Sequence, residues 1–350
     1  MRLTQRRLLK RLSALALPSI RRPEQIFIAS IHWNTERILQ SWNEALGGLV
    51  KELGTENVFV AVHENGSWDG TKAALKELDA QLGANNVERN ISVSNTTHLD
   101  EILADHGSGW VETSRGIREL RRIPYLFRLR NQALELLQQL AQKGTTFDKV
   151  LFLNDVVFSP SDALQLLGTN NGEYAAACAM DFKTPPQFYD TFALRDAEGS
   201  EILMQTWPYF RARKSRHALL AKRPTPVASC WSGMVAMAAQ PFLSSPPLRF
   251  RGVSDSVAAS HVEGSECCLI HVDNTEKQVY VNPNVLVGYS SESYDAIHSM
   301  SMILSPWQMF QALCENRIRR CVTSSWHARR KIQRRLRGWN TTQLELGDAG

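Results

Sequence analysis

The chain has 350 residues, 43% of them hydrophobic, and a formal charge of +5 from 40 basic and 35 acidic residues. This length allows one large domain or two moderate ones, and 20 glycines with 14 prolines argue against a fibrous or disordered protein. No apolar run approaches the ~18 residues of a membrane-spanning helix, and the six cysteines include no zinc-like Cys-x-x-Cys pair.

The positive charge is concentrated at the two ends. Residues 1–22 hold seven Lys/Arg and residues 317–337 hold nine, with no acid in either, so that the 24 basic and 33 acidic residues of 23–316 leave the body near −9. Basic ends can contact an anionic membrane surface, or they can be solvated flanks. We expect no nucleic-acid partner, because no basic core or recognisable reading module accompanies them. The early apolar stretch stops at Pro18 and Arg21, too soon for a signal anchor.

From residue 25 short apolar runs alternate with longer amphipathic ones, which is typical of βαβ units. We predict a domain over 25–295, between a basic segment at 1–24 and a basic helical extension at 296–350. In chain order the expected elements are strand 26–31, helix 35–53, strand 58–62, helix 71–82, a surface insertion over 94–120, a helix after Pro124, strand 149–158, a short helix over 163–167, strand 175–182 and apolar runs at 227–237, 267–272 and 279–287. The pattern predicts an α/β fold with a mostly parallel sheet and helices on both faces, and ligands at the carboxyl ends of the strands.

A first polar cluster follows the second predicted strand, where His63–Thr71 reads HENGSWDGT. Its candidates for ligand binding are Glu64, Ser67 and Asp69. A turn with Gly, Ser and Asp before a helix exposes backbone N–H groups that can hold a ribose or a nucleobase. The same residues also suit a plain helix N-cap.

The second cluster is Asn154-Asp155, at the end of the most apolar predicted strand. An Asp in that place is costly to leave without a partner. The partner can be an Arg, backbone donors or a divalent cation, and Mg²⁺ or Mn²⁺ on this carboxylate can bridge to a diphosphate. A helix cap or a buried ion pair is the structural alternative.

A third set of charged residues comes from several segments. Asp181 ends a strand and Asp190 follows soon after, while Glu266 directly precedes an apolar run. Arg128 and Arg130 lie on one predicted helix. Because they are two residues apart, they point to different faces and cannot both reach one phosphate.

Several common enzyme motifs are missing. No GxxxxGK[ST] loop occurs, so the chain is not an ordinary P-loop ATPase. The first strand lacks the Gly-x-Gly-x-x-Gly of NAD dehydrogenases, and no Gly-x-Ser-x-Gly of α/β-hydrolases is present. A divalent-metal site that grips a nucleotide diphosphate fits the remaining pattern best.

Eight stretches of the chain resemble a known family, the fungal capsule-associated α-1,3-mannosyltransferases of glycosyltransferase family 69. Each stretch is weak alone, but they run in order over residues 26–290. They are HENGSWDGTK (63–72), RIPYLFRLRN (122–131), VLFLNDVVF (150–158), ACAMDF (177–182), YDTFALRD (189–196), SCWSGMV (229–235), SECCL (265–269) and YVNPNVLV (280–287).

The resemblance implies a GT-A-type, Rossmann-like nucleotide-sugar fold, GDP-mannose as donor, a glycan acceptor, retention of anomeric configuration, and Mn²⁺ (or Mg²⁺) as cofactor. It also implies localisation to the secretory pathway, in the Golgi. Asp155 stands where such enzymes carry a metal-binding Asp-x-Asp. This chain departs from that pattern, because residue 153 is Leu and Asn154 is the other polar residue.

On this reading, the departing diphosphate is stabilised by a metal on Asp155 and by one of Arg128 and Arg130. This electrostatic stabilisation should contribute more to catalysis than the groups near the sugar do. Glu266 and Asp190 are candidates for the carboxylate near the anomeric carbon or the acceptor. Together with Asn154 and the first cluster, the arginines would bind the donor. Asp181 and Trp231 are candidates for acceptor or sugar contact, with core packing as the alternative for Trp231.

Two other classes of function stay open. The incomplete Asp-x-Asp is compatible with a catalytically silent relative that acts as a scaffold or export factor in polysaccharide biosynthesis. The basic ends are compatible with a binder of nucleic acid or membranes. Donor binding, with and without Mn²⁺, separates these classes.

Overall fold

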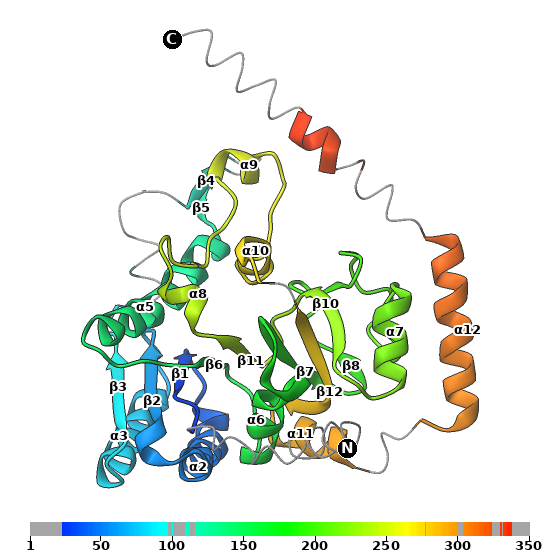
Figure 1. Ribbon diagram of the computed structural model, residues 1–350. Coiled ribbons are helices and arrows are strands. Elements are labelled where there is room, and N and C mark those ends of the chain that lie inside the picture. Colours follow the sequence, from blue (N-terminus) through cyan, green and yellow to red (C-terminus); the bar gives the residue numbers. More distant parts are fainter. Residues whose placement is uncertain are drawn as a thin grey trace, which may run out of the picture.

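The computed structural model describes residues 23–96, 100, 109–112, 116–276, 278–299, 304–323, 330 and 332–337. The predicted basic segment 1–24 therefore lies almost entirely outside the described residues, as does much of 324–350. Figure 1 shows the described body as one sheet with helices packed around it.

The centre of the molecule is a ten-stranded sheet in the order β3-β2-β1-β6-β11-β7-β12-β10-β9, with β8 paired to β7. A separate two-stranded sheet contains β4 and β5. The strands are β1 Ile26–His32, β2 Val58–Glu64, β3 Glu88–Val93, β4 Trp110–Glu112, β5 Arg118–Leu120, β6 Lys149–Leu153, β7 Ala176–Thr184, β8 Gln187–Phe188, β9 Arg195–Asp196, β10 Thr225–Ser229, β11 Met234–Ala238 and β12 Val279–Gly288.

Most strands of this sheet run in the same direction. β3, β2, β1 and β6 are parallel neighbours, and β7 is parallel to β12. β11 is antiparallel to both β6 and β7, and β10 is antiparallel to both β12 and β9. With β8 antiparallel to β7, seven of the ten strands point one way and three the other. The predicted α/β fold with a mostly parallel sheet is confirmed.

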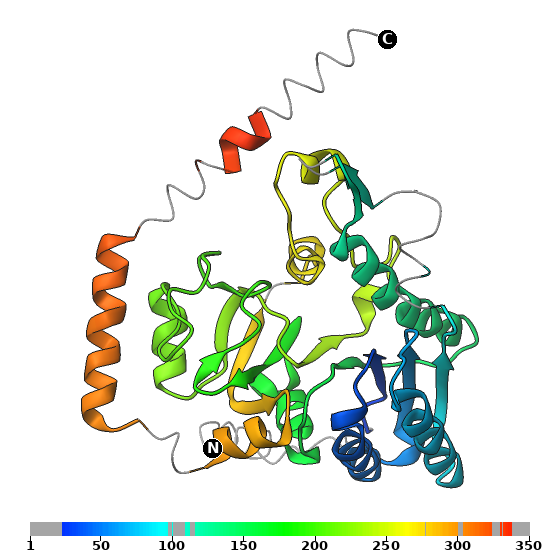
Figure 2. The ribbon, with the colours of Figure 1, turned by 180° about the vertical axis from the view of Figure 1, so that it is seen from behind.

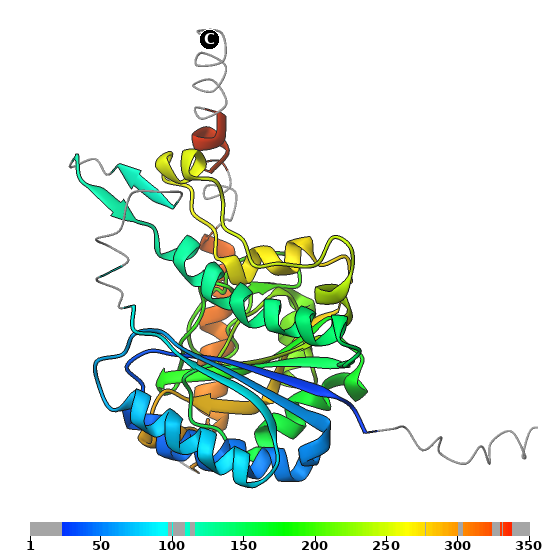
Figure 3. The ribbon, with the colours of Figure 1, turned by 90° about the vertical axis from the view of Figure 1, so that its left-hand side faces the viewer.

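Helices cover both faces of the sheet, as predicted, and Figure 3 shows the two layers from the side. One face packs on α2, α3 and α6, the other on α5, α8 and α10, in two separate hydrophobic clusters. The helices are α2 Glu36–Leu53, α3 Thr71–Ala84, α5 Arg122–Gln142, α6 Pro160–Leu167, α7 Arg213–Leu220, α8 Gln240–Leu243, α9 Asp255–Ala259, α10 Glu266–Asp273, α11 Ser291–His298 and α12 Pro306–Val322.

Three local predictions are wrong in detail. The apolar run 149–158 is a strand only to Leu153, because the chain then turns and Val157 pairs with Gly288. The insertion predicted over 94–120 contains the β4–β5 hairpin, and strand β3 precedes it. Helix α5 begins at Arg122, two residues before Pro124, because proline is tolerated in the first turn of a helix.

The start of α5 is fixed by Arg121, which is buried. Its guanidinium forms ion pairs with Asp255 at 2.5 Å and Glu263 at 2.9 Å, and donates to the carbonyl of Val253 at 3.1 Å. This arginine therefore ties α5 to the segment that leads into α10.

A disulfide joins Cys178 of β7 to Cys230, which follows β10; the two cysteines are 52 residues apart in the chain. Cys267, Cys268, Cys314 and Cys321 are free. No helix among the described residues is both long and apolar enough to cross a membrane.

Candidate active site

Six of the residues selected from the sequence lie close together beyond the carboxyl end of β6. They are Asn154, Asp155, Arg130, Glu266, Asp190 and Trp231. They come from β6, α5, α10, the segment after β8 and the turn between β10 and β11. Carboxyl ends of parallel strands are where ligands bind in open α/β sheets, so the site has the expected place in the fold.

The turn after β6 that carries Asp155 is held by the backbone of Asn154. Asn154 donates its backbone N–H to the carbonyl of Gly233 at 2.9 Å, and its own carbonyl accepts from the indole of Trp42 at 3.1 Å. Gly233 has φ +64°, and a Cβ there would lie 2.6 Å from a methyl group of Val287. A side chain at this glycine would therefore push apart the strand ends that hold Asp155.

Arg130 and Glu266 form the closest ion pair of the site, at 2.9 Å between Nη1 and Oε1, with side chains only 14% and 3% exposed. Glu266 is the first residue of α10, whose N-cap Ser265 accepts from the backbone of Cys267. An acid in the first helical turn is favoured by the helix dipole. Burial and the N-terminus of α10 therefore hold the Arg130–Glu266 ion pair in one position.

Trp231 packs against the other side of Arg130. The guanidinium carbon lies 5.2 Å from the indole centroid, and the indole contacts the rings of Phe152 and Phe250 at 5.0 and 5.1 Å between centroids. With 2% of its surface exposed, the ring face is not available for stacking on a sugar. Its indole N–H is buried too and has no hydrogen-bond partner among the described residues.

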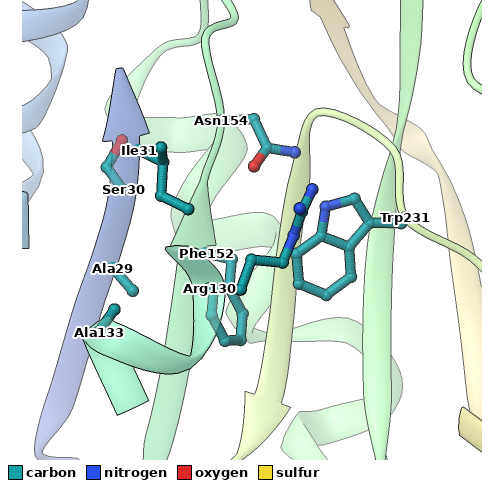
Figure 4. Close-up of a pocket in the computed structure, with 8 residues that line it drawn as sticks. All are labelled: Ala29, Ser30, Ile31, Arg130, Ala133, Phe152, Asn154 and Trp231. Atoms are coloured by element: carbon teal, nitrogen blue, oxygen red, sulfur yellow. The ribbon is translucent and has the colours of Figure 1, made fainter. Parts of the chain in front are cut away.

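A small cavity lies between these groups. Figure 4 shows Arg130 extending beside Trp231 towards Asn154, with Ser30 and Ile31 of β1 on the other side. Its volume of about 10 Å³ is about the space that one water molecule needs. The cavity lies between the end of β1, the end of β6 and the middle of α5.

Asp190 is positioned by Asp181, which is fully buried within β7 and does not end the strand as predicted, because β7 continues to Thr184. The backbone N–H of Asp190 donates to Oδ1 of Asp181 at 3.0 Å, and the hydroxyl of Tyr289 donates to Oδ2 at 3.1 Å. The ring of Tyr289 also contacts Tyr189, at 4.8 Å between centroids. Asp181 therefore lies behind the site, and its role in this geometry is to orient the loop that carries Asp190.

Burial raises the pKa of Asp181 to about 7, and the charge of Asp190 raises it too, against the hydrogen bonds from Asp190 and Tyr289. Burial raises the pKa of Asp190 to about 6, although the Phe192 N–H and Arg130 favour its ionised form. The folded protein therefore retains protons that an unfolded chain has released above about pH 4. It follows that these two groups reduce stability as the pH rises from about 4 to about 7.

We expect Asp181→Asn to flatten this pH dependence. Asn keeps an acceptor for the Asp190 N–H and can donate its amide to the Tyr289 hydroxyl, so the packing is preserved. The loss of unfolding free energy between about pH 4 and pH 7 should shrink by up to ~4 kcal/mol. Urea unfolding at four pH values across this range measures it. A variant whose profile runs parallel to that of the wild type would contradict the assignment.

Arg130 is the central cation of the site. Burial opposes its charge, but Cys267 and Glu266 favour it, and the pKa of the guanidinium is raised. Burial raises the pKa of the Cys267 thiol well above its ordinary value, so the thiol is neutral at neutral pH. The acids are therefore the counterions of Arg130.

Asp155 retains accessible surface although protein atoms surround it on most sides. Burial raises the pKa of its carboxyl, while Arg130 and Lys183 favour the ionised form. The three carboxyl groups of Asp155, Asp190 and Glu266 thus share Arg130, and Lys183 is a further cation near Asp155. A diphosphate would meet a surplus of acids here unless a further positive charge accompanied it.

These residues can bind a divalent cation only if the phosphates of the substrate supply some of its ligands. No group of three His, Cys, Asp or Glu residues suited to a metal occurs in the described part of the chain. Mg²⁺ is commonly bound by one or two carboxylates together with substrate phosphates and waters. The accessible Asp155 carboxylate can be such a ligand, and Asn154 in place of a second acid makes a preformed cage unavailable.

The first cluster lies apart from this group, at the ends of β1 and β2. The buried Glu64 accepts from the backbone N–H of Ser67, and Lys72 lies 4.0 Å from its other oxygen. The hydroxyl of Ser67 accepts from the Asn34 N–H at 2.9 Å. Asp69 accepts from the N–H groups of Glu36 and Thr71, so for Asp69 the structure shows the capping role.

Arg128 is exposed on α5, whereas Arg130 points into the site. The two arginines thus point to different faces, as their spacing predicts. Buried His32 is no acid–base candidate, because burial lowers its pKa to about 3 and it bonds to Ser30 and Thr35.

Sequence reasoning missed Lys183, Tyr289 and the exposed pair Trp33 and Trp68, whose rings meet at 5.1 Å between centroids. Each of these residues follows or ends a strand, or lies in a strand-end loop. The strand-end rule that selected Asp155 could therefore have found them.

Comparison with known proteins agrees with the family resemblance of the sequence. The family model described as Cryptococcal mannosyltransferase 1 matches residues 25–273, which are 249 of the 350 residues. The chain belongs to this family. Membership of a family described by a mannosyltransferase supports a glycosyltransferase, which is a hexosyltransferase by class. Membership of this family and the observed sheet together confirm the GT-A-type fold that the resemblance implied.

Solved structures similar to this chain are remote. TarS 1-349 of S. aureus with UDP-GlcNAc has 12% identity and a TM-score of 0.40, and the match covers 84% of this chain and 66% of that one, just under two thirds. The mannosyltransferase PcManGT of Pyrobaculum calidifontis with GDP-Man and Mn²⁺ has 13% identity and a TM-score of 0.39. That match covers 94% of this chain and 81% of the other. No curated protein matches the chain.

Proposed function

We propose that this protein transfers mannose from GDP-mannose to a hydroxyl of a glycan acceptor, with retention and with formation of an α-1,3 linkage, assisted by Mn²⁺ or Mg²⁺. The observation that supports this most is the cluster of Asp155, Arg130, Glu266 and Asp190 at the end of β6 in a member of this family. Acidic and basic groups meet there at the place where a nucleotide sugar would present its diphosphate.

In this proposal each residue has a separate role. The metal, held by Asp155 and the donor diphosphate, would supply charge neutralisation of the leaving group. Arg130 is oriented by Glu266 and would donate hydrogen bonds to a phosphate oxygen. Asp190 would face the anomeric carbon or the acceptor hydroxyl, with its orientation set by Asp181. The unpartnered indole N–H of Trp231 would donate to a sugar or phosphate oxygen.

Glu64 supports a guanine base in the donor. Its Oε2 is buried, with the Lys72 ammonium at 4.0 Å and no hydrogen-bond partner among the described residues, and a buried oxygen without a hydrogen bond is costly for a carboxylate. Guanine carries a ring N–H and an amino group on one edge, and a carboxylate accepts from both. Nearby Trp33 and Trp68, 43% and 71% exposed, offer rings on which a base can stack.

We expect Glu64→Gln to weaken GDP-mannose binding by about ten- to a hundredfold, since a hydrogen bond to a charged group contributes ~1.5–3 kcal/mol. Titration calorimetry measures the affinity, and exposed Glu52 of α2 provides a matched control as Glu52→Gln. Equal affinities of Glu64→Gln and the wild type would remove Glu64 from the base site.

The function itself is tested by incubating the protein with GDP-mannose, an α-mannoside acceptor and Mn²⁺, with a chelator as control. Transfer or donor hydrolysis supports the proposal. Tight donor binding without turnover would support a silent scaffold or export factor in polysaccharide biosynthesis, which Asn154 in place of an acid keeps as the second candidate. Absence of donor binding would contradict both.

We further propose a place in the secretory pathway, in the Golgi. The Cys178–Cys230 disulfide supports it, because structural disulfides persist in oxidising compartments.

A further inference from the structure

Helix α12 presents a continuous apolar stripe to solvent. Trp307, Phe310 and Ile318 are 64%, 56% and 61% exposed, and the rings of Trp307 and Phe310 stack at 5.6 Å. At about 100° per residue, seven side chains lie within about 60° of the direction opposite buried Asn316, and Gln311 is the one polar residue among them. The other six form the α12 stripe, namely Trp307, Phe310, Cys314, Ile318, Cys321 and Val322.

The contacts of α12 with the body lie on the other side of the helix. Asn316 donates to the carbonyl of Phe210 at 3.3 Å, and Arg211 donates to the carbonyl of Thr323 at 3.1 Å. Figures 1 and 2 show α12 beside α7, at the outer edge of the structure. The body therefore holds the helix with its stripe turned outwards, and exposed apolar patches of this kind mark interaction surfaces.

Charge indicates what covers the stripe. Arg317, Arg319 and Arg320 lie on the same helix, and residues 317–337 contain nine Lys/Arg and no acid. A second copy packed stripe to stripe in a parallel arrangement would bring two of these basic segments together and repel. Arg317 lies beside the stripe, whereas Arg319 lies nearer the body and pairs with Glu315. A helix with Trp and Phe on its apolar face and a basic C-terminal end suits the headgroup region of an anionic bilayer.

We propose that α12 docks this protein on an anionic membrane, with the α12 stripe inserted at the level of the acyl chains and Arg317, beside the stripe, on lipid phosphates. The sequence alone suggested attraction of basic ends to such a surface. The structure adds an apolar component in a defined orientation. This inference is independent of the donor and of the transfer reaction.

The test is co-sedimentation of the full chain with phosphatidylcholine vesicles, with and without phosphatidylserine. We expect binding to the anionic vesicles and a loss of affinity of about tenfold or more in Trp307→Glu. Val272→Glu is the matched control, since Val272 of α10 is 65% exposed and the charge change is the same. Circular dichroism confirms that both variants are folded.

Three outcomes would overturn the proposal. Absence of binding to either vesicle excludes the surface. Equal binding of Trp307→Glu and Val272→Glu means that charge alone attracts the protein. A dimer in sedimentation velocity that dissociates in Trp307→Glu assigns the stripe to a second copy.

Discussion

Asp155→Asn should lower mannose transfer by two or more orders of magnitude, equivalent to ~3 kcal/mol of transition-state stabilisation, and leave stability nearly unchanged. The substitution removes the anionic oxygen that would hold the metal, and it nearly preserves shape. Because burial raises the pKa of Asp155, loss of its charge does not cost the folded state. Transfer assays over a range of Mn²⁺ concentrations, with melting temperatures of the same samples, measure both effects.

The structure makes this test decisive. A structural Asp155 would be the partner of Arg130, and its neutralisation would leave a buried cation alone at a cost of ~3–5 kcal/mol. Arg130 instead has Glu266 at 2.9 Å. A large fall in melting temperature, with full activity in the remaining folded protein, would end the assignment of Asp155 as metal ligand.

Glu266→Gln should have the opposite profile and destabilise the protein by about 3 kcal/mol. Both side chains of the Arg130–Glu266 pair are shielded from water, and removal of one partner of a buried pair leaves the other charge uncompensated. Urea unfolding at neutral pH measures this loss. Activity should also fall, because the orientation of Arg130 depends on the pair.

The double variant Arg130→Met with Glu266→Gln separates stability from function. Replacing both charges of a buried pair is often close to neutral for stability, so we expect most of the unfolding free energy to return. Transfer should stay low, because the phosphate loses its donor. Recovery of activity together with stability would show that the pair is purely structural.

The sequence indicated several residues of the site, but not which of them contact one another. Strand-end position selected Asp155, Asp190 and Glu266, because apolar runs reveal where strands and helices begin and end. No local pattern shows that Arg130 meets an acid 136 positions later. For Trp231 the sequence left open a sugar contact or core packing. The structure shows core packing of its ring against Phe152 and Phe250.

The amino-acid sequence by itself determined the α/β class, the edge of the sheet that carries the polar residues, and the family. These properties follow from the period of apolar residues and from short ordered motifs, which are local in the chain. Only the tertiary structure decided the early end of β6, the Cys178–Cys230 disulfide, the partner of Arg130 and the outward face of α12. Each of these depends on which distant segments pack together, and hence on contacts whose free energy no single stretch of sequence contains.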